Sequence, residues 1–282
     1  MNRESHLKDK GLYGICMAVF FTMMALFLWI SMDILIQGVA NLNVSFLTDL
    51  PENAGRSGGI RPVISSTLII LTISLLISFP ISFASAIILS GKIWPQNKFH
   101  QFVQSSVTIL AGVPSIVFGL FGNVFFCQYL GLGYSLLSGG LTLACMILPL
   151  SIKLLEEAIR SIPKQLIISA RALNLSRRTC TLKVIIPAIA PQMTAAYILS
   201  IGRALAETAA LLFTSGYVMR DPRSLLDSGR TLSIHIFDLS MNITGGNQNA
   251  YQTALILMIF LLAINGIGHG INKVWRTVNY GI

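Results

Sequence analysis

The chain has 282 residues, of which 54% are hydrophobic and only 11% are charged, and its formal net charge is +9. A soluble globular domain carries roughly twice that charged fraction, so the composition excludes an ordinary soluble protein and indicates a membrane protein. The length accommodates several spans of about 20 residues each and leaves little for a separate catalytic domain.

The first expected element is an apolar span over residues 12–37, preceded by a basic N-terminal stretch. This run is longer than the roughly 7–15 residues of a cleavable signal core, and no small-residue cleavage site ends it. We therefore expect a permanent membrane anchor. Asp33 lies near its outer end, where its side chain is expected to reach the membrane interface.

Further apolar segments follow along the chain, and Gly and Pro interrupt most of them, which neighbouring helices in a bundle can accommodate. In chain order they cover residues 63–89, 107–127, 136–152, 190–213 and 253–271. Together with the first span, they predict an all-α integral membrane protein with six transmembrane helices.

The distribution of Lys and Arg predicts the orientation of these spans, because positive charge is enriched in cytoplasmic loops. With the N-terminus inside, 14 of the 20 basic residues fall in inside segments, five fall outside, and Arg203 lies within the membrane. We therefore expect cytoplasmic N- and C-termini. The positive net charge then reflects topology and contact with anionic membrane lipid, not nucleic-acid binding.

The third span contains a glycine-rich run over residues 112–122. Gly119 and Gly122 are three positions apart and share one helix face, where small residues let two backbones approach closely. Pro114 is expected to bend the entry to the run. We favour packing or gating geometry over direct ligand contact, with Ser115 as a candidate hydroxyl donor.

The longest expected inside segment, residues 153–183, carries a helical pattern of its own. Pro163 suits the first turn of a helix, and Asn174 suits the left-handed residue that ends one. Such a helix either lies on lipid headgroups or docks into a groove on a soluble partner, and the pattern alone leaves both open. Its apolar stripe at spacings of three and four consists of Ile159, Ile162, Leu166, Ala170 and Leu173.

Arg203 and Glu207 are charged residues inside the fifth predicted span. On a helix they would lie on one face within reach of each other. Charges at bilayer depth are costly and normally face a bundle interior or a water-filled path. We expect either a structural ion pair that fixes helix packing or a path in which Arg203 binds an anion and Glu207 holds Arg203 when the path is empty.

Motifs for nucleotide binding and hydrolytic catalysis are missing from the sequence. It has no G-x-x-x-x-G-K-[ST] loop, no G-x-S-x-G turn and no H-E-x-x-H helix. Its four cysteines and four histidines are scattered, so no metal site is expected. We expect no cofactor on this chain: if ATP drives transport, ATP and Mg bind a separate partner ATPase.

Part of the inside segment resembles the EAA loop of ATP-binding-cassette (ABC) importer permeases, which reads roughly E-A-A, three residues, G, nine residues, I-x-L-P. The resemblance lies in S-A-R-A-L-N-L-S-R at residues 169–177 and V-I-I-P at 184–187. Ile168 stands where the acidic residue usually sits, and Asn174 replaces the glycine. The resemblance implies a coupling helix seated in a cleft of the ATPase, and it assigns to this loop Ile162, Leu166, Ser169, Ala170, Leu173, Asn174 and Pro187.

Other segments resemble, more narrowly, the PstA-type permease subunits of phosphate-specific transporters. They are G-G-I-R-P at residues 58–62 with S-S-T-L at 65–68, G-V-P-S-I-V-F-G-L-F-G at 112–122, and R-A-L-A-E-T-A-A-L-L-F-T at 203–214. The last is similar to R-A-x-G-E-T-A-P-L-L-F-T, with Ala206 and Ala210 in place of the usual Gly and Pro. The resemblance runs from about Gly58 to the C-terminus.

The resemblance implies a type I, MetI-like permease fold in a bacterial inner membrane. It divides the chain into a tail, first helix and periplasmic loop at residues 1–61, a permease domain at 62–272 and a cytoplasmic tail at 273–282. Expected partners are a PstC-like permease, a PstB-like ATPase dimer and a periplasmic phosphate-binding protein. Phosphate is expected to pass Arg203, Glu207, Thr208 and Ser115, without covalent chemistry on this chain.

Two alternatives to phosphate import stay open. The chain could be a permease for another oxyanion or a small solute, since the EAA-like loop would have the same role there. It could also be a membrane scaffold or sensor that does not transport, and the missing carboxylate at Ile168 is the best support for that reading.

Overall fold

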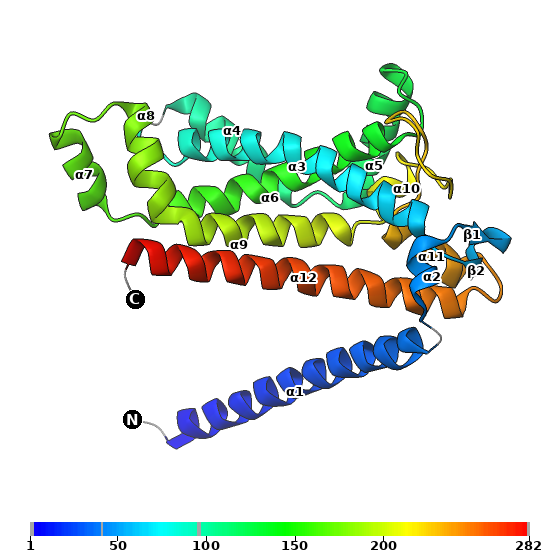
Figure 1. The fold of residues 1–282 in the computed structure, drawn as a ribbon. Helices are drawn as coiled ribbons and strands as arrows, with labels where there is room; N and C mark the ends of the chain where they lie inside the picture. Colours follow the sequence, from blue (N-terminus) through cyan, green and yellow to red (C-terminus); the bar gives the residue numbers. More distant parts are fainter. Residues whose placement is uncertain (1–2, 41, 95–96, 281–282) are drawn as a thin grey trace.

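A computed structural model of the chain describes residues 3–40, 42–94 and 97–280, and most of them are helical (Figure 1). The long helices are α1 (Arg3–Val39), α3 (Arg61–Leu89), α6 (Leu136–Arg160), α9 (Ile186–Leu205) and α12 (Asn247–Tyr280). The shorter helices are α2 (Val44–Thr48), α4 (Lys98–Ala111), α5 (Ser115–Gly122), α7 (Lys164–Ala172), α8 (Arg177–Cys180), α10 (Ala209–Leu212) and α11 (Leu232–Met241). Short 3-10 or π segments are η1 (Asn53–Gly55), η2 (Asn123–Tyr129) and η3 (Thr181–Ile185), and strands β1 (Pro51–Glu52) and β2 (Ser57–Gly58) pair as an antiparallel hairpin.

Helices α3, α6, α9 and α12 lie side by side along the long axis of the molecule (Figure 1). The most extensive helix contact is between α3 and α6, and α3 buries a stripe of mostly small residues at a spacing of four, where small side chains let two helices approach closely. This stripe consists of Ser66, Ile70, Ser74, Ser78, Ser82 and Ala86. Opposite it, Gly140 lies so close to Ile73 that an added Cβ would be 2.6 Å from that side chain.

Helix α1 diverges from this bundle and joins it only near the C-terminal end of α1 (Figure 1). There Gly38 packs against Tyr251 and Leu255 of α12. The carboxylate of Asp33 accepts hydrogen bonds from the Tyr251 hydroxyl at 2.9 Å and from the Gln37 amide at 2.6 Å. Asp33 therefore ties α1 to α12 near the end of the first span.

The third predicted span is a pair of helices, not one straight helix. Helix α4 and the α5–η2 segment meet at 102°, with Pro114 as the N-cap residue of α5. Proline has no N–H to continue the helical hydrogen bonds, and it disfavours helical geometry in the residue before it. The break between α4 and α5 therefore falls directly before Pro114. In the described part of the chain, five helices are long and apolar enough to span a membrane, and this bent pair makes six if it crosses as one span.

The two ends of the molecule differ in character. Helices α7 and α8 lie at one end, and α1 starts and α12 finishes on the same side; we call this the α7 end (Figure 1). The opposite end, which we call the hairpin end, carries β1, β2, α2 and α11 (Figure 1). An apolar core at the α7 end joins α3, α6, α7 and α9 through residues that include Leu155, Ile159, Ile162, Ile167, Ala170 and Ile185.

The hairpin end contains a buried charge cluster. The Arg230 guanidinium pairs with Asp238 at 2.8 Å, donates to the Tyr217 carbonyl at 3.2 Å and lies 3.4 Å from Nδ1 of His235. His235 is fully buried beneath Gly55, and its Nε2 has no hydrogen-bond partner among the described residues. The cluster therefore joins α11 to the loop before it and to the hairpin.

Candidate translocation path and coupling helix

Arg203 and Glu207 do not lie on one continuous helix, contrary to the expectation from their spacing. Helix α9 ends at Leu205, and the Ala206 N–H bonds to the Gly202 carbonyl as the chain leaves the helix. The fifth predicted span, residues 190–213, thus contains a helix end, a short connection and the separate helix α10. Among the described residues, no ion pair joins Arg203 to Glu207.

Glu207 is a buried capping residue. Its carboxylate accepts a hydrogen bond from the Ala210 N–H at 3.1 Å, and its backbone carbonyl accepts one from the Ser233 hydroxyl at 2.5 Å. A carboxylate at a helix N-terminus is favourable because the first N–H groups of a helix lack partners within it. The proline that the resemblance leads one to expect at position 210 has no N–H, so this hydrogen bond depends on Ala210.

Arg203 has an exposed side chain on the last turn of α9. Thr208 is the half-buried N-cap residue of α10, and Ser115 is the half-buried first residue of α5. In the described part of the chain, no hydrogen bond links Arg203, Thr208 or Ser115 to one another. The structure therefore puts two of the four predicted path residues at the starts of neighbouring short helices and Arg203 on the surface.

The glycine-rich run packs closely against its neighbours. A Cβ added to Gly119 would be 2.8 Å from the Cα of Ala210, and one added to Gly122 would clash with the Thr142 side chain. These approaches confirm the packing interpretation of the run. They also fix α5 against α10, the helix that Glu207 caps.

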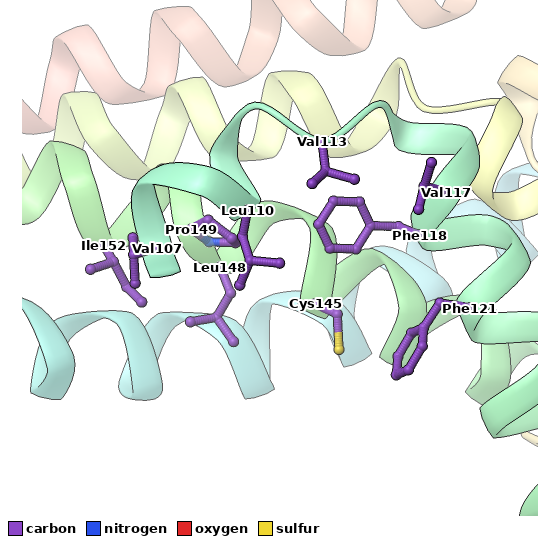
Figure 2. A pocket seen from close by; sticks show the side chains of 10 residues that line it. All are labelled: Val107, Leu110, Val113, Val117, Phe118, Phe121, Cys145, Leu148, Pro149 and Ile152. Carbon is purple, nitrogen blue, oxygen red and sulfur yellow. The ribbon is translucent and has the colours of Figure 1, made fainter. Parts of the chain in front are cut away.

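An apolar cavity of about 500 Å³ lies on the inner side of the bend between α4 and α5 (Figure 2). Figure 2 shows Val113, Phe118 and Phe121 from the bent pair facing Cys145 and Leu148 of α6. Sequence reasoning missed this cavity, since it exists only because the third span is bent. With an almost entirely apolar lining, the cavity fits a hydrocarbon group and not a hydrated anion.

Helix α7 shows two different apolar faces, so the predicted single stripe is wrong in part. Ile162, Ile167 and Ala170 are buried against the rest of the chain. Leu166 and Leu173 are 45% and 73% exposed, respectively, and Ser169 is exposed beside them. Helix α6 ends at Arg160 and α7 begins after Pro163, so Ile162 precedes α7 and helical phase is not carried across the break. Within α7, Ile167 and Ala170 form the buried face and Leu166 lies on the exposed side.

Asn174 ends α7 as its sequence position predicts. Its φ of 51° is left-handed, its N–H bonds to the Arg171 carbonyl at 2.9 Å, and the Leu175 N–H bonds to the Ala170 carbonyl at 3.1 Å. This pair of bonds is a Schellman motif, in which two otherwise unsatisfied carbonyls of the last turn gain partners. Pro187 is the second residue of α9, directly after the π segment η3.

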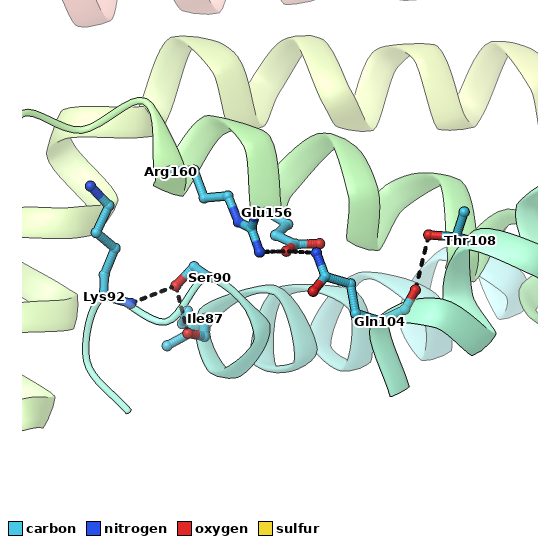
Figure 3. Close-up of polar contacts among 7 residues, drawn as sticks. All are labelled: Ile87, Ser90, Lys92, Gln104, Thr108, Glu156 and Arg160. Atoms are coloured by element: carbon cyan, nitrogen blue, oxygen red, sulfur yellow. Dashed lines mark hydrogen bonds and ion pairs between the residues drawn. The ribbon is translucent and has the colours of Figure 1, made fainter. Parts of the chain in front are cut away.

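A polar link joins α4 to α6 just before α7 begins (Figure 3). Glu156 is buried, and its carboxylate receives the Arg160 guanidinium at 2.6 Å and the Gln104 amide at 3.1 Å. Sequence reasoning did not select Glu156, although its spacing of four from Arg160 is a recognisable signal for an ion pair on one helix face. The link ties α4 of the bent pair to the end of α6.

Comparison with known proteins assigns the family. Residues 78–274 match the family described as "Binding-protein-dependent transport system inner membrane component". The chain belongs to this family. It is an ABC importer permease subunit with several membrane-spanning helices, as the EAA-like loop had indicated.

Individual relatives agree with this assignment. The permease is 31% identical to "Probable ABC transporter permease protein YqgI" of Bacillus subtilis, over 94% of both chains. It is 28% identical to "Phosphate transport system permease protein PstA 2" of Mycobacterium bovis, over 93% of this chain and 85% of that protein. A solved structure of the MetNI methionine ABC transporter shares the fold, with a TM-score of 0.64 at 19% identity, over 77% of this chain and 95% of that one.

Proposed function

We propose that the permease is the PstA-type subunit of an ATP-driven importer of inorganic phosphate in a bacterial inner membrane. A homologous PstC-like permease forms the path with it, a PstB-like ATPase dimer drives the path, and a periplasmic binding protein delivers phosphate. In this proposal the α7 end and both termini face the cytoplasm. The chain itself performs no covalent chemistry, and ATP and Mg bind the ATPase.

The observation that supports the proposal most is the exposed guanidinium of Arg203 near the end of helix α9. A guanidinium on a membrane-spanning helix needs a water-filled path or an anion, because a charge facing lipid is costly. Glu207 is committed to capping α10, so the donors of Arg203 are not held by that carboxylate. Arg presents a planar fork of N–H groups that matches phosphate oxygens, and Ser115 and Thr208 offer hydroxyls on helices that pack together.

The exposed face of α7 supports coupling to a separate ATPase. Leu166, Ser169 and Leu173 lie on a helix side that the rest of the chain leaves uncovered, whereas Ile167 and Ala170 anchor the other side in the core. A short helix with one face anchored and one apolar face free fits a groove on a soluble partner. Movement of that partner would reach α6 and α9 through the buried face.

Radiolabelled phosphate uptake at low external phosphate tests the proposal. We expect Arg203→Gln to reduce uptake to background while the ATPase still copurifies with the permease. The matched control is Arg223→Gln, which removes an exposed charge from the loop before α11 and should leave uptake unchanged.

Competitor anions decide which solute is carried. Competition by arsenate but not by sulfate or molybdate supports phosphate, because all three anions are tetrahedral but only arsenate is protonated near neutral pH as phosphate is. Normal uptake in Arg203→Gln would contradict the path assignment. Competition by another solute would place the permease with the importers of other anions or small solutes, and loss of ATPase association from the unaltered chain would favour a scaffold or sensor.

A further inference from the structure

A second cavity lies behind the coupling helix and is lined by cations. It has a volume of about 550 Å³ and is formed between the α3–α4 connection, α7 and α8. Lys92 and Trp94 line one wall, Arg171 and Arg177 line the other, and Ile167 and Cys180 are the buried apolar part. The lining contains no carboxylate.

The cavity walls are fastened to each other by these same side chains. Lys92 donates from Nζ to the Ile162 carbonyl at 2.9 Å, and Arg171 donates from Nη2 to the Lys92 carbonyl at 2.9 Å. The Arg177 guanidinium lies 5.2 Å from the centre of the Trp94 ring. The cations are therefore held at the cavity by contacts that leave most of their N–H groups unused, since a guanidinium has five and an ammonium three.

None of the three cations has a carboxylate partner within 4 Å in the described part of the chain. Like charges around one cavity repel each other, and an anion bound between them removes that repulsion and gains charge-assisted hydrogen bonds. The cavity is also on the anchored side of α7, behind Ile167 and Ala170, and not on the exposed side with Leu166 and Leu173.

We propose that this cavity binds a phosphate group. Planar guanidinium forks match phosphate oxygens, and the neighbouring Trp94 is a residue type that favours the membrane–water boundary. Two sources share this chemistry: the headgroup of an anionic phospholipid, and free phosphate in solution. Occupancy of the cavity does not depend on the transported solute, whereas any effect of occupancy on coupling rests on the proposed function.

Trp94 fluorescence measures occupancy directly. The purified full-length chain carries Trp29→Phe and Trp275→Phe, so that Trp94 is its remaining tryptophan. In one arm, inorganic phosphate is titrated onto the chain in phosphatidylcholine nanodiscs. In the other, nanodiscs of phosphatidylcholine with increasing phosphatidylglycerol are compared without phosphate. A saturable change in Trp94 emission in the first arm identifies free phosphate as the source, and a change in the second identifies the lipid headgroup.

Substitutions at the cavity separate a site from general surface charge. We expect Arg171→Gln to weaken the response about tenfold, the loss of one charge-assisted hydrogen bond, and Arg177→Gln to act likewise. Arg178→Gln removes an exposed neighbouring charge outside the cavity and should change the response less than about twofold. Far-UV circular dichroism confirms that each variant is folded, and if one of the two cavity variants is not, the other carries the test.

The titration is repeated in the Arg203→Gln background, so that binding in the translocation path does not contribute. An unchanged Trp94 response there supports the cavity even if the uptake experiment fails. Constant Trp94 emission in both arms would overturn the proposal, as would equal weakening by Arg171→Gln and Arg178→Gln.

Discussion

Individual residues determine how α7 ends and what is buried at the hairpin end, and apolar spacing alone predicts neither feature. Asn174 adopts a left-handed φ of 51°, which an asparagine tolerates better than most side chains. His235 is fully buried beside Arg230 and Asp238, where a protonated ring would add a second positive charge. Each residue makes a prediction that one substitution can check.

Asn174→Gly should be tolerated, because glycine adopts the same left-handed conformation without strain. Asn174→Val should destabilise the turn by about 1–2 kcal/mol, since a branched Cβ clashes in that region. The measurement is copurification of the ATPase with each variant, together with the thermal midpoint of the complex. Loss of the ATPase from Asn174→Gly would show that the asparagine side chain, and not the backbone turn, is needed.

His235 should make the free energy of unfolding of the hairpin end decrease as pH falls. Burial, with the neighbouring Arg230 charge, lowers the pKa of His235 from 6.5 to about 3. Between these two values the unfolded chain binds a proton that the folded chain excludes, so stability falls as pH drops below about 6.5. The expected loss is on the order of 1 kcal/mol per pH unit, measured as the thermal midpoint of the purified protein between pH 7 and pH 4.

His235→Asn is the matched variant for this acid dependence. Its amide oxygen can accept from Arg230 as Nδ1 does, and it does not titrate. We expect a flatter stability profile below pH 6.5 than in the unaltered chain. Parallel profiles for the two proteins would assign the acid dependence to other groups.

At the scale of helices, apolar length identified the spans, but tertiary contacts decided where they break. Pro114 signals the bend before α5, whereas nothing local signals the end of α9, because alanine at position 206 favours helix. The break follows from contacts of distant residues: Ser233 bonds to the Glu207 carbonyl, and Gly119 packs on Ala210. The spacing of four between Arg203 and Glu207 could not predict that Glu207 caps a new helix and makes no ion pair with Arg203.

Gly119→Ala should separate α5 from α10. Its added Cβ would be 2.8 Å from the Cα of Ala210, and overpacking of this kind costs about 1–3 kcal/mol. Gly112→Ala is the matched control, because its Cβ would meet only the Ile109 carbonyl, at an ordinary 3.5 Å. We expect a lower thermal midpoint and reduced uptake for Gly119→Ala alone. Equal behaviour of the two variants would show that the α5–α10 contact does not support the path.

The whole molecule presents an unusual amount of apolar surface, and helix α1 accounts for much of it. The most apolar stretch of α1 is not buried against the rest of the chain, and Trp29 within that helix is 72% exposed. Lipid and partner subunits are the environments that accept such a surface. Hydropathy could predict that α1 crosses the membrane, but not its distance from the bundle, because an apolar run does not show which helix or lipid covers it.

The orientation of the molecule is the prediction that tests all elements together. Of the Lys and Arg residues, 14 fall in the segments at the proposed cytoplasmic side, against five on the other. In a chain whose four native cysteines are replaced by serine, Arg178→Cys should react with a membrane-impermeant maleimide only after cells are permeabilised. Arg223→Cys should react in intact cells, since it lies in the loop that leads to α11 at the hairpin end. The reversed labelling pattern would put α7 outside the cell and separate it from any cytoplasmic ATPase. The same experiment therefore also tests the proposed contact between α7 and the ATPase.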